Sequence, residues 1–169
     1  MVTLKISSTM KKICLILLLA LSTTSCNKYE PLLFERTPYF GNEVRTDGFW
    51  YHVSYSQYIG SRMNLYFLYR DGSFLFARTL HTTDPNDVTI DSVARIYNNQ
   101  IDWGLFRVED SVLQQTEWFW PGPGSGKALL YNYVIINDTC IQSEGEGDYY
   151  YFHPFEFKPD STIARQWIP

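Results

Sequence analysis

The chain has 169 residues, and the first 25 have the features of a removable export signal, so the mature protein has the length of one domain. Hydrophobic residues make up 45% of the chain, charged residues 19% and aromatic residues 17%, a composition that excludes a disordered chain and a coiled coil. Because Lys5, Lys11 and Lys12 are the only charged residues before Cys26, 11 of the 14 basic residues remain against 18 acidic ones, and this net charge of −7 argues against nucleic-acid binding, which needs a basic surface.

A short hydrophobic segment occupies residues 13–21, between Lys11-Lys12 and the small residues 22–25. Nine helical residues cover roughly 14 Å, about half of the roughly 30 Å that a membrane-spanning helix must cross. The segment therefore predicts a secretory signal rather than a transmembrane helix.

Cys26 ends this segment and resembles the lipobox cysteine of bacterial lipoproteins, which is acylated and becomes the new N-terminus. The resemblance implies a signal peptide at 1–25 and acylation of Cys26. Residues 27–46 mix charges with Pro31 and Pro38 and show no sustained periodicity, so we expect an acylated tether at 26–46 and a globular domain at 47–169. Asn27, in place of Asp, favours the outer membrane of the cell envelope by the same resemblance. The alternative is an ordinary cleaved signal followed by a cysteine.

Once Cys14 is removed with the signal and Cys26 is acylated, Cys140 is the one cysteine left, so no disulfide is expected within the mature chain. Its apolar surroundings predict a small buried core residue.

Beyond Asp47-Gly48, short aromatic and β-branched runs alternate with turn residues, which is typical of strands. We expect a strand at 49–56, hairpins at 62–80, 103–120 and 129–142, a strand at 149–157 and a closing strand at 163–167. The hairpin turns are predicted at Asp71-Gly72, Glu109-Asp110 and Asn137-Asp138. Residues 85–97 would permit one short helix.

The hairpin at 62–80 has apolar residues on both faces, because Met63, Leu65 and Phe67 alternate with Tyr66 and Leu68. Sequential hairpins of this kind predict an all-β, up-and-down antiparallel barrel of about eight or nine strands. A two-sheet sandwich is the alternative, and it would need longer crossovers than these turns provide.

Several segments resemble the lipocalin-like small lipoproteins of Bacteroidota, namely residues 45–51, 103–110, 115–118 and 134–139. The resemblance implies a lipocalin-like (calycin-type) barrel and an envelope location, and it supplies no catalytic residue.

The chain offers little local evidence of chemistry. His52, His81 and His153 are far apart in sequence and predict no metal site. The acidic stretch 84–87 lacks the ligand spacing of an EF-hand and is better explained as a solvated turn with a helix cap. Nucleophile-elbow, phosphate-loop and zinc-protease motifs are missing from the sequence, so we expect neither an enzyme nor a cofactor.

Two functions remain open. The barrel is either a binding module for a small apolar or glycan ligand, or a filled structural subunit that docks another envelope protein. For the first function, aromatic residues on neighbouring strands are the candidate ligand-binding residues, namely Trp103, Trp118, Trp120, Tyr131, Tyr133, Tyr149 and Tyr151. The alternative is that these rings are ordinary core packing.

Overall fold

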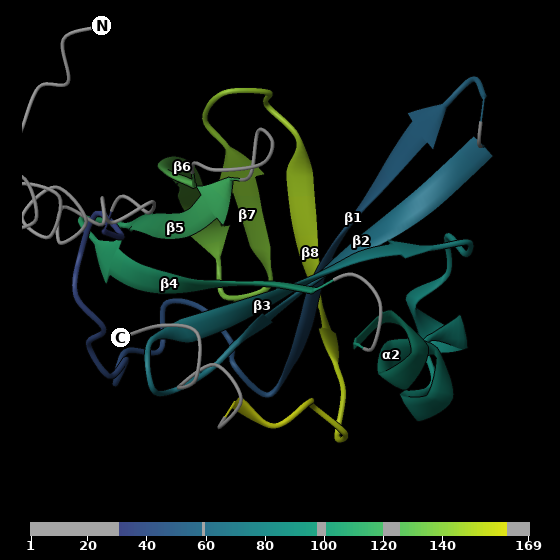
Figure 1. Cartoon of the computed structure of the whole chain (residues 1–169), viewed down its shortest axis with the longest axis horizontal. Coiled ribbons are helices and arrows are strands. Elements are labelled where there is room, and N and C mark those ends of the chain that lie inside the picture. Colours follow the sequence, from purple (N-terminus) through teal and green to yellow (C-terminus); the bar gives the residue numbers. More distant parts are fainter. Residues whose placement is uncertain (1–30, 59, 98–100, 120–125, 162–169) are drawn as a thin grey trace, which may run out of the picture.

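The hairpins join into one closed sheet in the computed structural model, which describes residues 31–58, 60–97, 101–119 and 126–161 (Figure 1). Neighbouring strands in sequence pair antiparallel, and β8 closes the barrel on β1 through Trp50 and Phe152. The eight strands are β1 (Gly48–Ser56), β2 (Gly60–Leu68), β3 (Ser73–Leu80), β4 (Ile101–Glu109), β5 (Val112–Phe119), β6 (Lys127–Asn137), β7 (Cys140–Ser143) and β8 (Tyr149–Pro154). The prediction of an all-β up-and-down barrel is confirmed. The expected closing strand at 163–167 lies outside the described residues.

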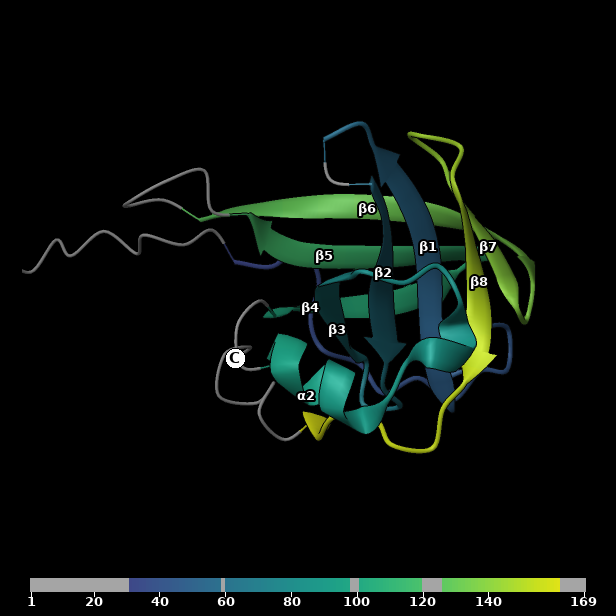
Figure 2. The same cartoon turned by 90° about the vertical axis from the view of Figure 1, so that its right-hand side faces the viewer.

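The β3–β4 connection carries two short helical segments, the 3-10 turn η1 (Pro85–Asp87) and the helix α2 (Ile90–Tyr97). Thr89 and Ser92 cap α2 reciprocally, because each side-chain oxygen accepts a hydrogen bond from the other residue's backbone N–H. Val88 and Val93 are buried against the outer face of the barrel. Figure 2 shows α2 and β6 on opposite sides of the barrel.

The hairpin turns follow their predicted positions closely. The β2–β3 turn contains Gly72 at φ +83°, in the left-handed region that the sequence predicts there. The β4–β5 turn lies one residue later than expected, at Asp110 and Ser111, which both have positive φ, because Glu109 still pairs with Val112. The β6–β7 turn is also one residue later, since the Asn137 side chain accepts a hydrogen bond from the Thr139 N–H while Asn137 itself remains in the ladder.

Alternating side chains produce two separate cores, one inside the barrel and one outside it. The inner core draws on all eight strands and includes Trp50, Phe74, Phe106, Leu113, Tyr133, Ile141 and Tyr150. The outer core covers β1 to β4 and includes Phe49, Met63, Leu65, Phe67, Leu75, Trp103 and Leu105. The prediction that the strands carry apolar residues on both faces is therefore confirmed.

Residues 31–46 have no helix or strand, yet they pack against the barrel. The Tyr39 backbone N–H bonds to the Arg70 carbonyl at 2.9 Å, and the Tyr39 ring lies 5.5 Å from the Phe106 ring inside the barrel. Val44 is 1% exposed and donates its N–H to the Tyr39 hydroxyl. Residues 39–44 therefore close one end of the lumen, and this part of the expected tether belongs to the folded body.

The strand expected at 149–157 ends at Pro154, and the residues after it cross the outer core. The Phe155 ring packs against the Phe49 and Phe67 rings. The Lys158 ammonium donates to the backbone carbonyls of Thr46 and Leu68. This segment therefore covers apolar surface that a barrel strand would otherwise expose.

Candidate binding site in the barrel lumen

The half of the lumen nearest residues 39–44 is filled by the protein's own side chains. Trp50, Leu68, Phe74, Phe106 and Leu113 are each no more than 1% exposed. The Trp50 indole N–H donates to the Arg45 carbonyl at 3.0 Å, which satisfies the polar atom of the largest of these side chains. A ligand that enters the barrel must therefore bind in the other half, which we call the open half.

Three tyrosines meet inside the open half, one each from β2, β6 and β8: Tyr66, Tyr133 and Tyr150. The Tyr150 ring lies 5.4 Å from the Tyr66 ring and 5.2 Å from the Tyr133 ring, both nearly edge to face. Their side chains also hydrogen-bond to one another. We call these three residues the tyrosine triad.

Strand β5 places two polar side chains on the same inner surface. Gln115 is 2% exposed and Glu117 is 9% exposed. Register places Gln115 opposite Phe106 and Glu117 opposite Gly104, where the Phe74 ring occupies the space that a side chain would need. The open half is therefore polar as well as aromatic, unlike the closed half.

Electrostatics keep the triad protonated. Burial raises the pKa of Tyr66, Tyr133 and Tyr150, and the nearby charge of Glu117 raises the pKa of Tyr66 and Tyr133 further. The hydroxyls can therefore both donate and accept hydrogen bonds at neutral pH.

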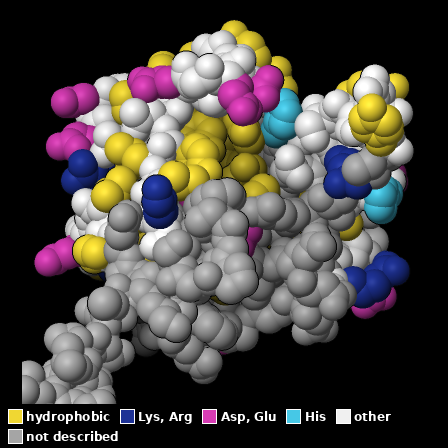
Figure 3. All heavy atoms as spheres, turned by 45° about the horizontal axis from the view of Figure 1, so that its top comes forward, with side chains coloured by type: hydrophobic (Ala, Val, Ile, Leu, Met, Phe, Trp, Pro, Cys, Tyr) yellow, Lys and Arg dark blue, Asp and Glu magenta, His cyan; other side chains and the backbone are white. Residues whose placement is uncertain are grey.

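His52 connects β1 to the β7–β8 turn near the triad. Its Nδ1 lies 3.1 Å from the Tyr149 carbonyl, its Nε2 lies 3.5 Å from an Asp148 carboxylate oxygen, and its ring lies 5.1 Å from the Tyr150 ring. Figure 3 shows the molecule with the top of Figure 1 turned toward the viewer. Hydrophobic side chains surround a hollow in this surface, and acidic side chains and a histidine lie along part of its edge.

The predicted ligand-binding residues divide between the two faces. Tyr133 lies in the lumen, and Tyr131 shares its inward register opposite Gln115 while remaining 38% exposed. Tyr149 and Tyr151 share a face, as alternation predicts, but it is the outer face, where they are 47% and 48% exposed. The Tyr149 and Tyr151 rings stack on each other with their centroids 6.4 Å apart.

The predicted tryptophans do not line the lumen either. Trp103 is 7% exposed in the outer core, 5.7 Å from the Tyr69 ring, and Trp118 packs against the same cluster. Trp120 lies outside the described residues. The interpretation of these rings as core packing therefore holds for Trp103 and Trp118.

Sequence reasoning missed Tyr66, Tyr150, Gln115 and Glu117. Alternation does group Tyr66 with Leu68, and it separates Tyr150 from Tyr149 and Tyr151. What the pattern lacks is a sign of which face is inward, because both faces of these strands carry aromatic residues. The polar alternation of Gln115 and Glu117 was the available signal for a polar lumen.

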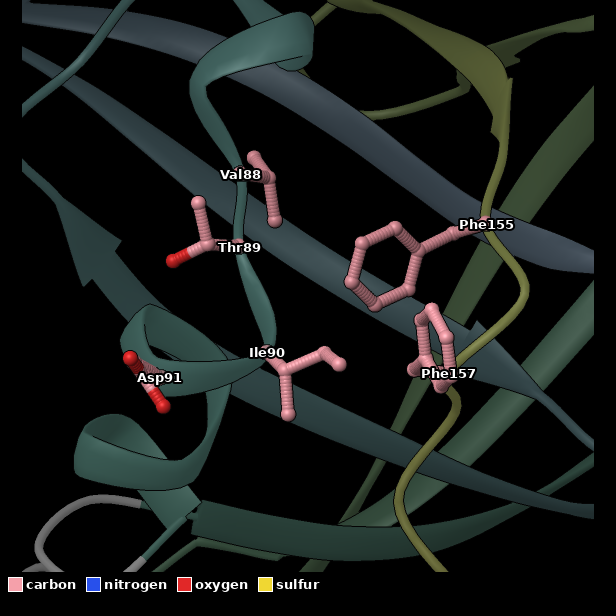
Figure 4. A pocket seen from close by; sticks show the side chains of 6 residues that line it. All are labelled: Val88, Thr89, Ile90, Asp91, Phe155 and Phe157. Carbon is pink, nitrogen blue, oxygen red and sulfur yellow. The ribbon is translucent and has the colours of Figure 1, made fainter.

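A second hollow lies outside the barrel, where α2 begins beside the C-terminal segment, with a volume of about 430 Å³. Figure 4 shows Ile90 and Phe157 pointing toward each other across it, and Val88 pointing toward Phe155. Ile90 and Phe157 are 49% and 53% exposed, so the groove is open to solvent. It has little polar chemistry with which to orient a ligand.

Metal-ligating side chains and a free thiol are the next candidates for chemistry in the part of the chain that the structure describes. That part contains no cluster of three or more His, Cys, Asp or Glu side chains suited to a metal ion. Cys140 is half-buried on the outer face rather than in the core as predicted, and burial raises the pKa of its thiol, which disfavours the reactive thiolate. None of the described helices has the length and hydrophobicity needed to cross a membrane.

Comparisons of the chain with protein-family models, curated proteins and solved structures found no significant match. The functional conclusion therefore depends on the geometry of the barrel and on the N-terminal sequence.

Proposed function

We propose that this chain is an envelope lipoprotein, anchored through acylated Cys26, whose lipocalin-like barrel binds a small hydroxyl-bearing ligand, of the size of one or two sugar rings, in the open half of the lumen. The observation that carries the proposal is the tyrosine triad beside Gln115 and Glu117 in the open half, while the half of the lumen nearest residues 39–44 is filled by side chains.

The chemistry of the open half supports a polar ligand over an apolar one. An apolar molecule placed there would displace water from the remaining donor and acceptor positions of these polar groups without replacing the hydrogen bonds to water, which costs free energy for each bond lost. A sugar hydroxyl can exchange with one of the bonds inside the triad, and tyrosine rings offer apolar faces for the C–H side of a sugar ring. The filled closed half limits the ligand to a small size.

Titration of the purified mature protein with a panel of mono- and disaccharides, followed by NMR or calorimetry, tests ligand binding. Tyr133→Phe removes one hydroxyl and keeps the ring, so it should weaken saccharide binding by about 2- to 10-fold. Tyr58→Phe is the matched control, because Tyr58 is 86% exposed at the β1–β2 turn. An apolar fluorescent probe should bind more weakly than the saccharide that binds best.

The alternative function is a filled barrel that docks an envelope partner, and the packed closed half favours it. A folded protein that binds neither saccharides nor the apolar probe would support that alternative and contradict ligand binding.

The anchor is tested separately with Cys26→Ala in the native host. We expect the variant to lose its acyl mass and to leave the membrane fraction. A variant that keeps both would contradict the lipoprotein assignment.

A further inference from the structure

The outward-facing positions of three neighbouring strands carry no Asp, Glu, Lys or Arg. The inward positions Tyr133, Ile141 and Tyr150 fix which residues point outward on each strand. The outward residues are Ala128, Leu130, Asn132, Val134 and Ile136 on β6, Cys140 and Gln142 on β7, and Tyr149, Tyr151 and His153 on β8. The solvent face of an antiparallel sheet is normally polar, so an uncharged face in an acidic chain requires an explanation.

Strand β6 has the most apolar part of this face. Leu130, Val134 and Ile136 are 45%, 38% and 52% exposed, and we call these three residues the β6 stripe. Val112 of β5 pairs with Val134 and extends the stripe sideways. Figure 2 shows β6 along the side of the barrel that faces away from α2.

The outer face of β1 to β4 is covered by other segments of the chain, unlike the β6 stripe. The apolar outer face of β1 to β4 is covered by Val88 and Val93 of the β3–β4 connection, by Leu32 and Phe34 of the N-terminal segment and by Phe155. The protein thus covers one apolar face with its own segments, while the β6 stripe stays half exposed in the described part of the chain.

The N-terminal segment reaches the barrel beside the β6 stripe. The Leu33 N–H bonds to the Thr116 hydroxyl, and Thr116 pairs directly with Leu130, the first residue of the stripe. Cys26 precedes Leu33 by seven residues, which span at most about 25 Å when fully extended. An acyl chain on Cys26 therefore keeps the bilayer surface within that distance of the position at which the chain joins the barrel.

We propose that the β6 stripe contacts the bilayer surface, so that the anchored barrel lies with β6 toward the lipid and α2 away from it. This inference depends on the proposed acylation of Cys26. The chain is acidic, so electrostatic attraction to anionic lipid does not assist the contact, and an uncharged apolar stripe can enter the interface without desolvating a charge.

The test uses the full acylated protein in phosphatidylcholine vesicles, with Cys140→Ser as background. A spin label is placed at Val134→Cys on the stripe or at Ala94→Cys, an exposed position on α2. We expect the label at position 134 to lose most of its collisions with a water-soluble relaxation agent when vesicles are added to the protein. The label at position 94 should keep its collisions with and without vesicles.

The outcomes separate the two proposals. If the protein carries the acyl group and stays with the vesicles while the label at position 134 remains accessible to water, the bilayer contact is wrong and the anchor stands. If mass spectrometry finds no acyl group on Cys26, both proposals fail. Protection at position 134 that is accompanied by spin–spin coupling without vesicles would identify a second copy as the occupant and would also overturn the bilayer contact.

Discussion

Substitution of Gly72 should destabilise the barrel by more than its backbone angle alone predicts. Gly72 lies in the β2–β3 turn at φ +83°, where any residue with a Cβ is strained. A Cβ at this position would also collide with the Thr37 carbonyl oxygen, well inside van der Waals contact. Because that oxygen belongs to the backbone, the N-terminal segment would have to move to make room.

Gly60 provides a matched control. It has nearly the same backbone angle, φ +78°, at the β1–β2 turn, but a Cβ added there would have no other atom within 4 Å. Gly60→Ala should therefore cost only the backbone strain, roughly 1–2 kcal/mol. Gly72→Ala should add the cost of displacing Thr37, roughly 1–3 kcal/mol more, as for other overpacked sites. Gly72→Val should cost more again, because a β-branched residue tolerates positive φ poorly.

Urea denaturation of the mature protein and the three variants measures these differences as changes in the free energy of unfolding. The expected order of destabilisation is Gly60→Ala, then Gly72→Ala, then Gly72→Val. Equal losses for the two alanine variants would show that the Thr37 contact has no energetic weight, and the packing of residues 31–46 on the barrel would then need revision.

Three further predictions concern buried polar groups. Burial lowers the pKa of Lys158 from 10.5 to about 8, so the unfolded chain holds more protons than the folded chain between these pH values. The free energy of unfolding should therefore rise with pH from about 8 to about 10, and denaturation of Lys158→Met should show a flatter pH profile. Burial raises the pKa of Tyr133, so the unfolded chain should release the Tyr133 proton at a lower pH than the folded chain does. The free energy of unfolding should therefore fall above about pH 10, and it should fall less steeply in Tyr133→Phe when both proteins are followed by tyrosinate absorbance. Trp50→Phe should destabilise more than Trp103→Phe in thermal unfolding, by about 1 kcal/mol, because the Trp50 N–H has an acceptor and the buried Trp103 N–H has none among the residues described.

The fold could be predicted because its evidence is local. Each hairpin combines two alternating runs with a short turn, and Gly72 or Asn137 fixes the turn without reference to distant residues. Sequential pairing then follows from the short connections, and the barrel closes because β8 has only β1 left to pair with. The small errors in turn position arise from single residues, since Glu109 and Asn137 both stay in the ladder where a turn was expected.

The site was harder to predict because alternation groups residues without saying which group is inside. Strand β8 contains Tyr149, Tyr150 and Tyr151 in succession, and the sequence offers no reason to prefer the middle ring. Closure on β1 decides the question, because it pairs Trp50 with Phe152 on the inner face and therefore places Tyr150 beside Tyr66. That contact joins residues 84 positions apart, which no local pattern can express.

The segments on either side of the barrel explain why one face is covered and another is not. Residues 31–46 and 155–161 lack periodicity, yet their contacts are specific: Lys158 bonds to carbonyls 112 and 90 residues away, and Leu33 bonds to Thr116, 83 residues away. Leu32, Phe34 and Phe155 of these segments lie on the β1 to β5 side, where the strands present an outer apolar core. Neither segment packs on the β6 stripe among the residues described, and the proposed contact with the bilayer would cover that stripe.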